Sequence, residues 1–242
     1  MKLRYWLVIA TYILIAQLSA VPLALYLVAQ GMSEPQAIGT SNVTSFTLGL
    51  IIILFLLKPD MANRHDIPGR STRSQAIGWS ILGILMAYGG QIIANMINQG
   101  IFGVQPGSEN TAEILALIES FPFMILIVSI IGPILEEIIF RMIIFGALYK
   151  RFNFAISAFA SSLIFAAVHF DFNHLLIYTV MGFIFAYLYI KTKRIIVPII
   201  AHVGINTIAV LLNFLLADYI DEILEQYEAI EQALALIMGV LL

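Results

Sequence analysis

Residues 122–149 read PFMILIVSIIGPILEEIIFRMIIFGALY, an apolar run that contains two adjacent glutamates and one arginine. It is long enough to cross a bilayer, because a transmembrane helix needs roughly 20 predominantly apolar residues. A charge near the centre of such a helix costs about 2.5–3.5 kcal/mol on insertion scales. The run therefore predicts a transmembrane helix whose charged side chains serve a purpose other than contact with water.

The whole chain has the same apolar character. Of its 242 residues, 61% are hydrophobic and 11% are charged, and none is cysteine. A soluble domain carries about a quarter charged residues. The composition thus indicates a polytopic membrane protein and excludes a soluble enzyme, a secreted disulfide scaffold and a nucleic-acid binder. The lack of cysteine also excludes a thiolate nucleophile and Cys-ligated zinc.

Apolar segments of helical length recur along the chain. They fall at about 5–28, 43–57, 77–97, 114–149, 154–170, 174–190 and 195–216, with a shorter one at 229–242. Such Ile- and Leu-rich runs indicate helices rather than barrel strands. The sequence predicts an all-α integral membrane protein, a bundle of seven or eight transmembrane helices with an intramembrane polar site. We divide it into N-terminal helices over 1–113, a core that holds the site over 114–216, and an acidic segment with a short apolar helix over 217–242.

The segment 114–149 is too long for one straight crossing, since a helix of this length would measure about 54 Å. Pro122 and the Gly132-Pro133 pair can interrupt it. We expect an interfacial or external piece up to about residue 121, followed by the crossing. The run at 229–242 is short for a span, so it is either an eighth helix or a segment that lies against the bundle.

The basic residues predict the orientation of the chain. All of them except Arg141 lie before the first run or in every second connection, whereas the other connections carry acids. Under the positive-inside rule the N-terminus is then cytoplasmic, and seven crossings place the acidic stretch 218–231 outside. We expect the protein to lie in the plasma membrane of a bacterium.

The charged residues of the crossing segment face different directions. Glu137 and Arg141 are four residues apart, so they share a helix face and can form an ion pair. Glu136 is rotated by about 100° from Glu137, which leaves it available for chemistry. The alternative is that all three belong to a structural ion network between helices.

Three further polar residues lie in apolar runs: His169 near the end of the fifth, and His202 and Asn206, four residues apart, in the seventh. Taken singly, each is explained as an interfacial residue or as a polar contact between helices. Together with the glutamates they can bind a divalent metal or hold a water with a carboxylate as base. Glu136 would take the water proton and pass it to the leaving amine, and Asn206 would hydrogen-bond the oxyanion or ligate a metal.

These residues form three ordered motifs: Glu136-Glu137-x-x-x-Arg141, Phe165-x-x-x-His169 and His202-x-x-x-Asn206. In this order and spacing they resemble the motifs of the CPBP family of intramembrane (metallo)proteases. This family comprises CAAX prenyl endopeptidases together with bacteriocin-processing and abortive-infection membrane proteins. The resemblance covers about 133–210. The chain departs from the pattern after the arginine, where it has Met142 and the family commonly has Gly, which bears on local helix packing.

The resemblance implies an intramembrane endopeptidase in which Glu136 is the activating carboxylate. His169, His202 and Asn206 would hold the water or a metal, and Glu137 and Arg141 would support them. A metal, with zinc as the first choice, would be ligated by His169, His202 and Glu136 with Asn206; the other reading is carboxylate-activated water with no metal.

The implied substrate is a membrane-embedded or membrane-anchored peptide or protein, lipid-modified in the eukaryotic relatives, and the lipid bilayer is the other partner. A function of another class stays open. Buried carboxylates and histidines also serve as proton relays, so a non-catalytic scaffold, an immunity factor or a proton- or ion-translocating helper is the alternative.

Depth in the membrane is the difficulty of this prediction. Counted from the basic ends at 1.5 Å per residue, Glu136 lies about 21 Å, His202 about 12 Å and His169 about 27 Å along its helix. Straight vertical helices would keep these side chains apart. Tilt, a late helix start after Arg151 or a re-entrant fifth segment is needed to bring them together.

Overall fold

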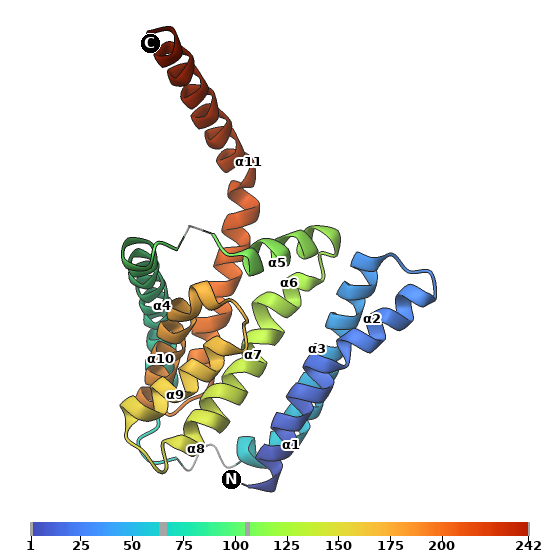
Figure 1. The fold of residues 1–242 in the computed structure, drawn as a ribbon. Helices are drawn as coiled ribbons and strands as arrows, with labels where there is room; N and C mark the ends of the chain where they lie inside the picture. The colour runs from blue at the N-terminus through green and yellow to red at the C-terminus, as the bar shows by residue number, and fades with distance from the viewer. Residues whose placement is uncertain (1, 63–66, 105–106, 242) are drawn as a thin grey trace.

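The computed structural model describes residues 2–62, 67–104 and 107–241, although the side chains of Glu109 and of most residues after Phe214 lie outside the description. These residues fold into helices and contain no strand (Figure 1), which confirms the predicted all-α class. Five helices are long and apolar enough to cross a membrane: Leu3–Ala29, Glu34–Ala62, Arg73–Phe102, Phe172–Thr192 and Ile196–Phe214.

The first of these spans is built from three pieces, and the next two are single helices. The elements are α1 (Leu3–Thr11), the π-helix η1 (Tyr12–Leu18), α2 (Ala20–Ala29), α3 (Glu34–Ala62) and α4 (Arg73–Phe102). A capping box begins α4, in which the Thr72 hydroxyl accepts from the Gln75 amide and the Gln75 side chain accepts from the Thr72 amide. Helix α4 ends at Gly103, whose φ of 67° a residue with a Cβ rarely adopts.

The segment 114–149 is broken at Pro122, as predicted, whereas the helix continues through Gly132-Pro133. Helix α5 (Glu109–Ser120) is a separate piece, and a second helical segment begins at Met124. This segment comprises α6 (Met124–Leu126), the π-helix η3 (Ile127–Ile131), α7 (Gly132–Glu136), the π-helix η4 (Glu137–Phe145) and α8 (Gly146–Leu148). The expected separation near residue 121 is confirmed, whereas the interfacial or external position of α5 stays a prediction.

The remaining elements are α9 (Phe154–Ala167), the short η5 (Phe172–His174), α10 (Leu175–Thr192) and α11 (Ile196–Leu241). Helix α9 has 14 residues, about 21 Å of rise, which is less than the roughly 30 Å hydrocarbon core. That α9 and the segment 124–148 both cross the membrane, giving seven crossings, stays a prediction. The backbone of α11 runs through residue 217 without a break, so 229–241 is not a separate helix; the acidic side chains of 218–231 lie outside the description.

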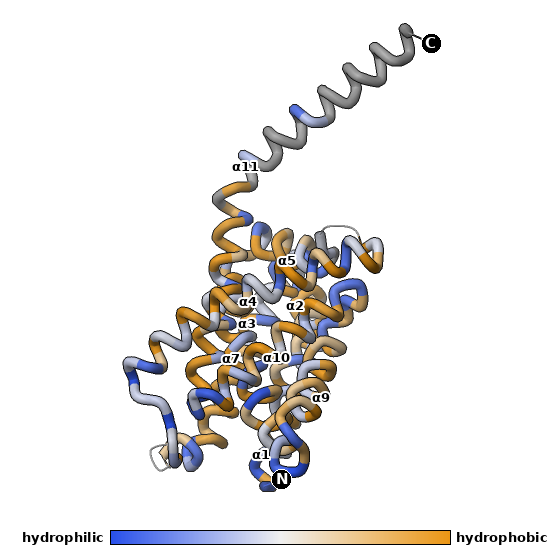
Figure 2. The backbone as a smooth tube through the Cα atoms, turned by 90° about the vertical axis from the view of Figure 1, so that its left-hand side faces the viewer, coloured by the Kyte–Doolittle hydropathy of each residue, from blue (hydrophilic) through white to orange (hydrophobic). Residues whose placement is uncertain are grey.

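Small residues let the helices of the bundle approach closely. A Cβ on Gly182 of α10 would come within 2.7 Å of the Ser162 hydroxyl on α9, and one on Gly83 of α4 within 2.6 Å of Leu188. Close packing through small residues is how membrane helices gain contact without a hydrophobic driving force. Large apolar side chains such as Leu85 and Met96 are instead exposed on the outside of the bundle. Figure 2 shows that hydrophobic residues predominate along the helices of the bundle, as contact with lipid requires.

The first span packs against the charged crossing segment. Val8, Tyr12 and Ala16 belong to the same buried cluster as Phe140 of η4 and Phe165 of α9. The Tyr12 and Phe140 rings meet edge to face with centroids 6.4 Å apart. Since Phe140 lies four residues after Glu136, this contact brings the first span over the face that carries Glu136.

Candidate active site

Four of the six predicted site residues line one cavity of about 670 Å³: Glu136, His169, His202 and Asn206. They come from three parts of the chain, since Glu136 ends α7, His169 follows α9, and His202 and Asn206 lie on α11. The other two, Glu137 and Arg141, are 0% and 1% exposed and sit behind the cavity wall. The cavity continues under α5, from which Asn110 and Ile114 contribute lining side chains.

A second, larger cavity of about 900 Å³ is lined by Lys2, Arg4, Lys150 and Arg151, among others, and contains none of the predicted site residues. Size alone does not mark the site. The smaller cavity is lined by the carboxylate of Glu136 and by three imidazoles, those of His169, His174 and His202. Ionisable groups inside a membrane protein are costly, so a cluster of them indicates a functional site.

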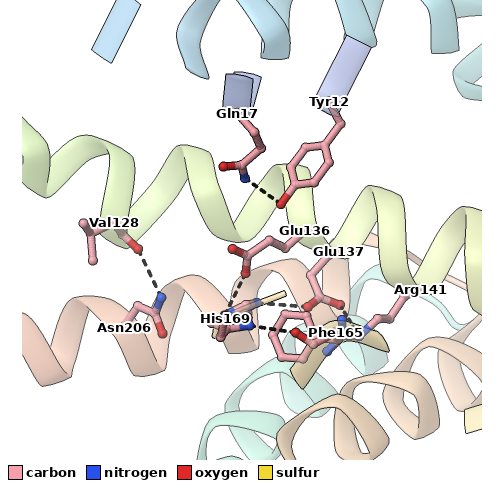
Figure 3. A network of polar contacts seen from close by, with 10 residues as sticks. Tyr12, Gln17, Val128, Glu136, Glu137, Arg141, Phe165, His169 and Asn206 are labelled. Atoms are coloured by element: carbon pink, nitrogen blue, oxygen red, sulfur yellow. Dashed lines mark hydrogen bonds and ion pairs between the residues drawn. The ribbon is translucent and has the colours of Figure 1, made fainter. Parts of the chain in front are cut away.

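Glu137, which lies behind the cavity wall, contacts both Arg141 and His202 (Figure 3). Its Oε2 lies 3.2 Å from Nε of Arg141, so the ion pair expected from the i, i+4 spacing is present. Its Oε1 lies 2.9 Å from Nδ1 of His202. Sequence spacing could not reveal this second contact, because it joins residues 65 positions apart.

The Arg141 guanidinium lies among aromatic rings. Its carbon is 4.2 Å from the centroid of Phe165, 5.3 Å from that of Phe185 and 6.0 Å from that of Phe140. None of its nitrogens has a hydrogen-bond acceptor among the described residues, so the contact with Glu137 has ion-pair distance without hydrogen-bond alignment. The ring faces and the carboxylate together replace the water that a buried charge loses.

The hydrogen bonds define which nitrogen of each histidine carries the proton. A carboxylate and a backbone carbonyl only accept. Nδ1 of His202 therefore donates to Glu137, and Nδ1 of His169 donates to the Phe165 carbonyl at 2.7 Å. In the neutral rings both Nε2 atoms then carry a free lone pair. Nε2 of His202 lies 3.7 Å from Oε2 of Glu136, too far for a direct hydrogen bond but close enough for both atoms to contact one water.

Aromatic rings hold the two imidazoles in place. The His202 ring stacks on Phe185 with centroids 4.8 Å apart. The His169 ring stacks on Tyr178 with centroids 4.2 Å apart and meets Phe165 edge to face. Asn206 is held differently: its Nδ2 donates to the carbonyl of Val128 at 3.1 Å.

The described residues contain no group of three or more His, Asp and Glu side chains arranged to hold a metal ion. His169, His202 and Glu136 line one cavity but, as placed, do not form such a group. The free Nε2 atoms are of the kind that metals use, with the other ring nitrogen held by a protein acceptor. As arranged, however, the donor set does not fit a metal, and the predicted zinc site stays a prediction.

Sequence reasoning missed a contribution from the first span. Gln17 lines the cavity, and its Nε2 donates to the Tyr12 hydroxyl at 2.9 Å. Figure 3 shows both side chains on the side of Glu136 opposite to Asn206 and His169. Gln17 could have been found by the criterion that identified the other site residues, because it is a polar residue inside an apolar run.

His174 lies in the short η5, between α9 and α10. It also lines the cavity, and its Nδ1 is 2.9 Å from Oδ1 of Asp171. Asp171 accepts from the Ser108 hydroxyl at 2.7 Å as well. Burial alone would raise the pKa of Asp171, but these hydrogen bonds outweigh it and hold the pKa below its usual value.

Glu136, His169 and His202 line one cavity in spite of the different depths expected from the sequence, and part of the difference arises at α9. Asn153 caps this helix by accepting from the Ile156 amide, so α9 begins at Phe154, three residues after Arg151. The helix ends at Ala167, and His169 lies in the non-helical turn beyond, where Phe170 has a φ of 55°. A late start and a position outside the helix place His169 at the cavity.

Comparison with known proteins identifies the class to which this fold and cavity belong. Residues 118–208 match the family model described as "Type II CAAX prenyl endopeptidase Rce1-like". All six predicted site residues lie within this range. The chain belongs to this family of CAAX protease-like membrane peptidases, as two relatives that match most of its length confirm.

The first relative is the protein named "Putative membrane peptidase YdiL" of Bacillus subtilis (strain 168). It is 43% identical over 220 residues, which cover 88% of this chain and 90% of the relative. The "Membrane-embedded CAAX protease MroQ" of Staphylococcus aureus (strain USA300) is 35% identical over 181 residues, covering 72% and 73% of the two chains. The chain is thus similar to bacterial membrane peptidases along most of its length. No solved structure matches it significantly.

Proposed function

We propose that the protein is an intramembrane endopeptidase that hydrolyses a peptide bond of a membrane-associated or lipid-modified substrate with water activated by Glu136. The observation that carries the proposal is the pair formed by Glu136 and His202. Oε2 of Glu136 and Nε2 of His202 face each other 3.7 Å apart at a cavity wall. The Glu136 side chain is 20% exposed, whereas that of Glu137 is 0% exposed, so only Glu136 can meet a substrate.

The reaction follows from these positions. A water between the two residues gives one hydrogen bond to Glu136 and the other to Nε2 of His202. Glu136 takes a proton as the water oxygen bonds to the peptide carbonyl carbon, and the carbonyl oxygen becomes an oxyanion. Glu136 then returns the proton to the amide nitrogen, and the C–N bond breaks to give a carboxylic acid and an amine.

The other residues hold this arrangement. Glu137 accepts from Nδ1 of His202 and so keeps the lone pair of Nε2 directed away from it. Asn206 has a second amide hydrogen besides the one directed to Val128, and this hydrogen can stabilise the oxyanion. Nε2 of His169 is a further acceptor at the same cavity.

The decisive experiment compares Glu136→Gln with Glu119→Gln in a proteolysis assay on candidate membrane peptides. Glu119 is an exposed carboxylate on α5 outside the cavity, so its variant is a matched control. We expect Glu136→Gln to abolish cleavage with an unchanged melting temperature and Glu119→Gln to remain active. Cleavage retained by Glu136→Gln would overturn the proposal. Proton flux into liposomes without any cleavage by the unmodified protein would favour the ion-translocating alternative.

The substrate itself can be captured with the same variant. Because Glu136→Gln keeps the cavity but loses the base, we expect a substrate protein to copurify with it, to be identified by mass spectrometry. The predicted cytoplasmic N-terminus is a separate proposal. It rests on the positive-inside rule, and a reporter enzyme fused to each terminus tests it.

A further inference from the structure

We propose that Pro133 positions Asn206. The proposal rests on the proposed function in one respect, namely that Asn206 acts on the reacting carbonyl. By lacking an N–H, Pro133 leaves the carbonyl of Val128 without a helical donor, and this carbonyl fixes the carboxamide of Asn206 at the cavity wall.

The backbone of η3 leaves the carbonyl of Val128 without a donor. Here the Gly132 N–H donates to the carbonyl of Ile127, five residues earlier, as in a π-helix. An α-helix would have directed this N–H to Val128. In the π pattern, Val128 would instead receive the N–H of residue 133, but that residue is proline and has none. The carbonyl of Val128 therefore receives neither the α-helical hydrogen bond from residue 132 nor the π-helical hydrogen bond from residue 133.

An unpaired carbonyl inside a membrane protein is costly, since no lipid group can donate to it. Asn206 supplies the missing hydrogen bond from another helix, with Nδ2 3.1 Å from the Val128 oxygen (Figure 3). A carbonyl only accepts, so the amide nitrogen of Asn206 must be the atom that faces Val128. The orientation of the carboxamide, which is often ambiguous, is thereby determined.

Gly132 has a complementary role in the same turn. A Cβ at this position would come 2.9 Å from the Ile127 oxygen, the acceptor of its own N–H. Gly132 and Pro133 are both buried. The glycine therefore permits the π turn, and the proline leaves the Val128 carbonyl without a helical donor. Both residues thus contribute to the hydrogen bond between Val128 and Asn206.

The test is a double-mutant cycle of Pro133→Ala and Asn206→Ala, with melting temperature as its first readout. Asn206→Ala leaves the Val128 carbonyl unpaired, so we expect the melting temperature to fall. Pro133→Ala supplies an N–H that can satisfy this carbonyl. The double variant should therefore melt higher than Asn206→Ala alone. This readout requires no substrate and is independent of the proposed function.

The second readout is the cleavage rate. Loss of an oxyanion donor costs roughly 100-fold or more in kcat, which we expect for Asn206→Ala. Pro133→Ala should also lower kcat, with little change in KM. In the Asn206→Ala background, Pro133→Ala should lower kcat no further. Pro59→Ala, which removes a proline inside α3 that does not line the cavity, is the control that should leave kcat unchanged.

The outcomes separate the two proposals. If Glu136→Gln is inactive but the kcat losses of Pro133→Ala and Asn206→Ala multiply, Pro133 does not act through Asn206 and the positioning proposal fails. It also fails if the double variant melts no higher than Asn206→Ala. If Glu136→Gln is active, the proposed function fails, while a stability rescue would still establish the link between Pro133 and Asn206.

Discussion

Oε1 of Glu137 lies 2.9 Å from Nδ1 of His202, and Oε2 of the same carboxylate lies 3.2 Å from Nε of Arg141. One fully buried carboxylate thus both neutralises a buried guanidinium and sets the proton position of an imidazole at the cavity. The carboxylate of Glu137, one of the three charges that raise the free energy of inserting the segment 122–149 into a membrane, is thus also the group that orients His202.

Removal of this carboxylate should affect stability and activity in ways that a second substitution separates. Glu137→Gln removes the counter-ion of the buried Arg141 charge, which costs about 3–5 kcal/mol of unfolding free energy. In Glu137→Gln/Arg141→Met no such charge remains, so we expect stability to recover while activity stays low, because a neutral carboxamide is a weaker acceptor for the Nδ1–H of His202 than a carboxylate. Melting temperature and cleavage rate measured on both variants check this; recovery of activity with stability would show that Glu137 is purely structural.

Metal removal should distinguish the two readings of the site. The described residues offer no group of three His, Asp and Glu side chains placed for a metal, so we expect cleavage to survive incubation with a strong chelator. Metal analysis of the purified protein and assays before and after zinc addition provide the measurement. Activity that is lost on chelation and restored by zinc would instead establish the predicted metal site.

Acid should weaken the connection between α5 and the turn after α9. The pKa of Asp171 is held below its usual value by the hydrogen bonds from Ser108 and His174, against the effect of burial. The stabilisation is therefore complete above the unfolded pKa of about 3.9 and is lost as the pH falls through the lower folded pKa. We expect the difference in melting temperature between the unmodified protein and Asp171→Asn to shrink from pH 6 to pH 3. An unchanged difference over this range would contradict the assignment.

The fold class and the positions of the candidate site residues in the sequence followed from local properties of the chain. Apolar runs of helical length predicted the helices, and the Glu137–Arg141 pair followed from its spacing on one helix. The break before Met124 followed from Pro122. What could not be predicted was the length and continuity of elements, as with the short α9 and the unbroken backbone of α11. These depend on how neighbouring helices pack rather than on the segment itself.

The sequence by itself determined that a few ionisable residues lie in apolar helices, because the cost of inserting each charge and the geometry of one helix are properties of a short stretch of chain. Only the tertiary structure decided what these residues do for each other. It placed Glu137 against His202, Val128 against Asn206 and Gln17 beside Glu136 across helices that are distant in sequence. The physical reason is that in a membrane every buried polar group must find a partner within the protein, and the partner that it finds depends on which helices pack together.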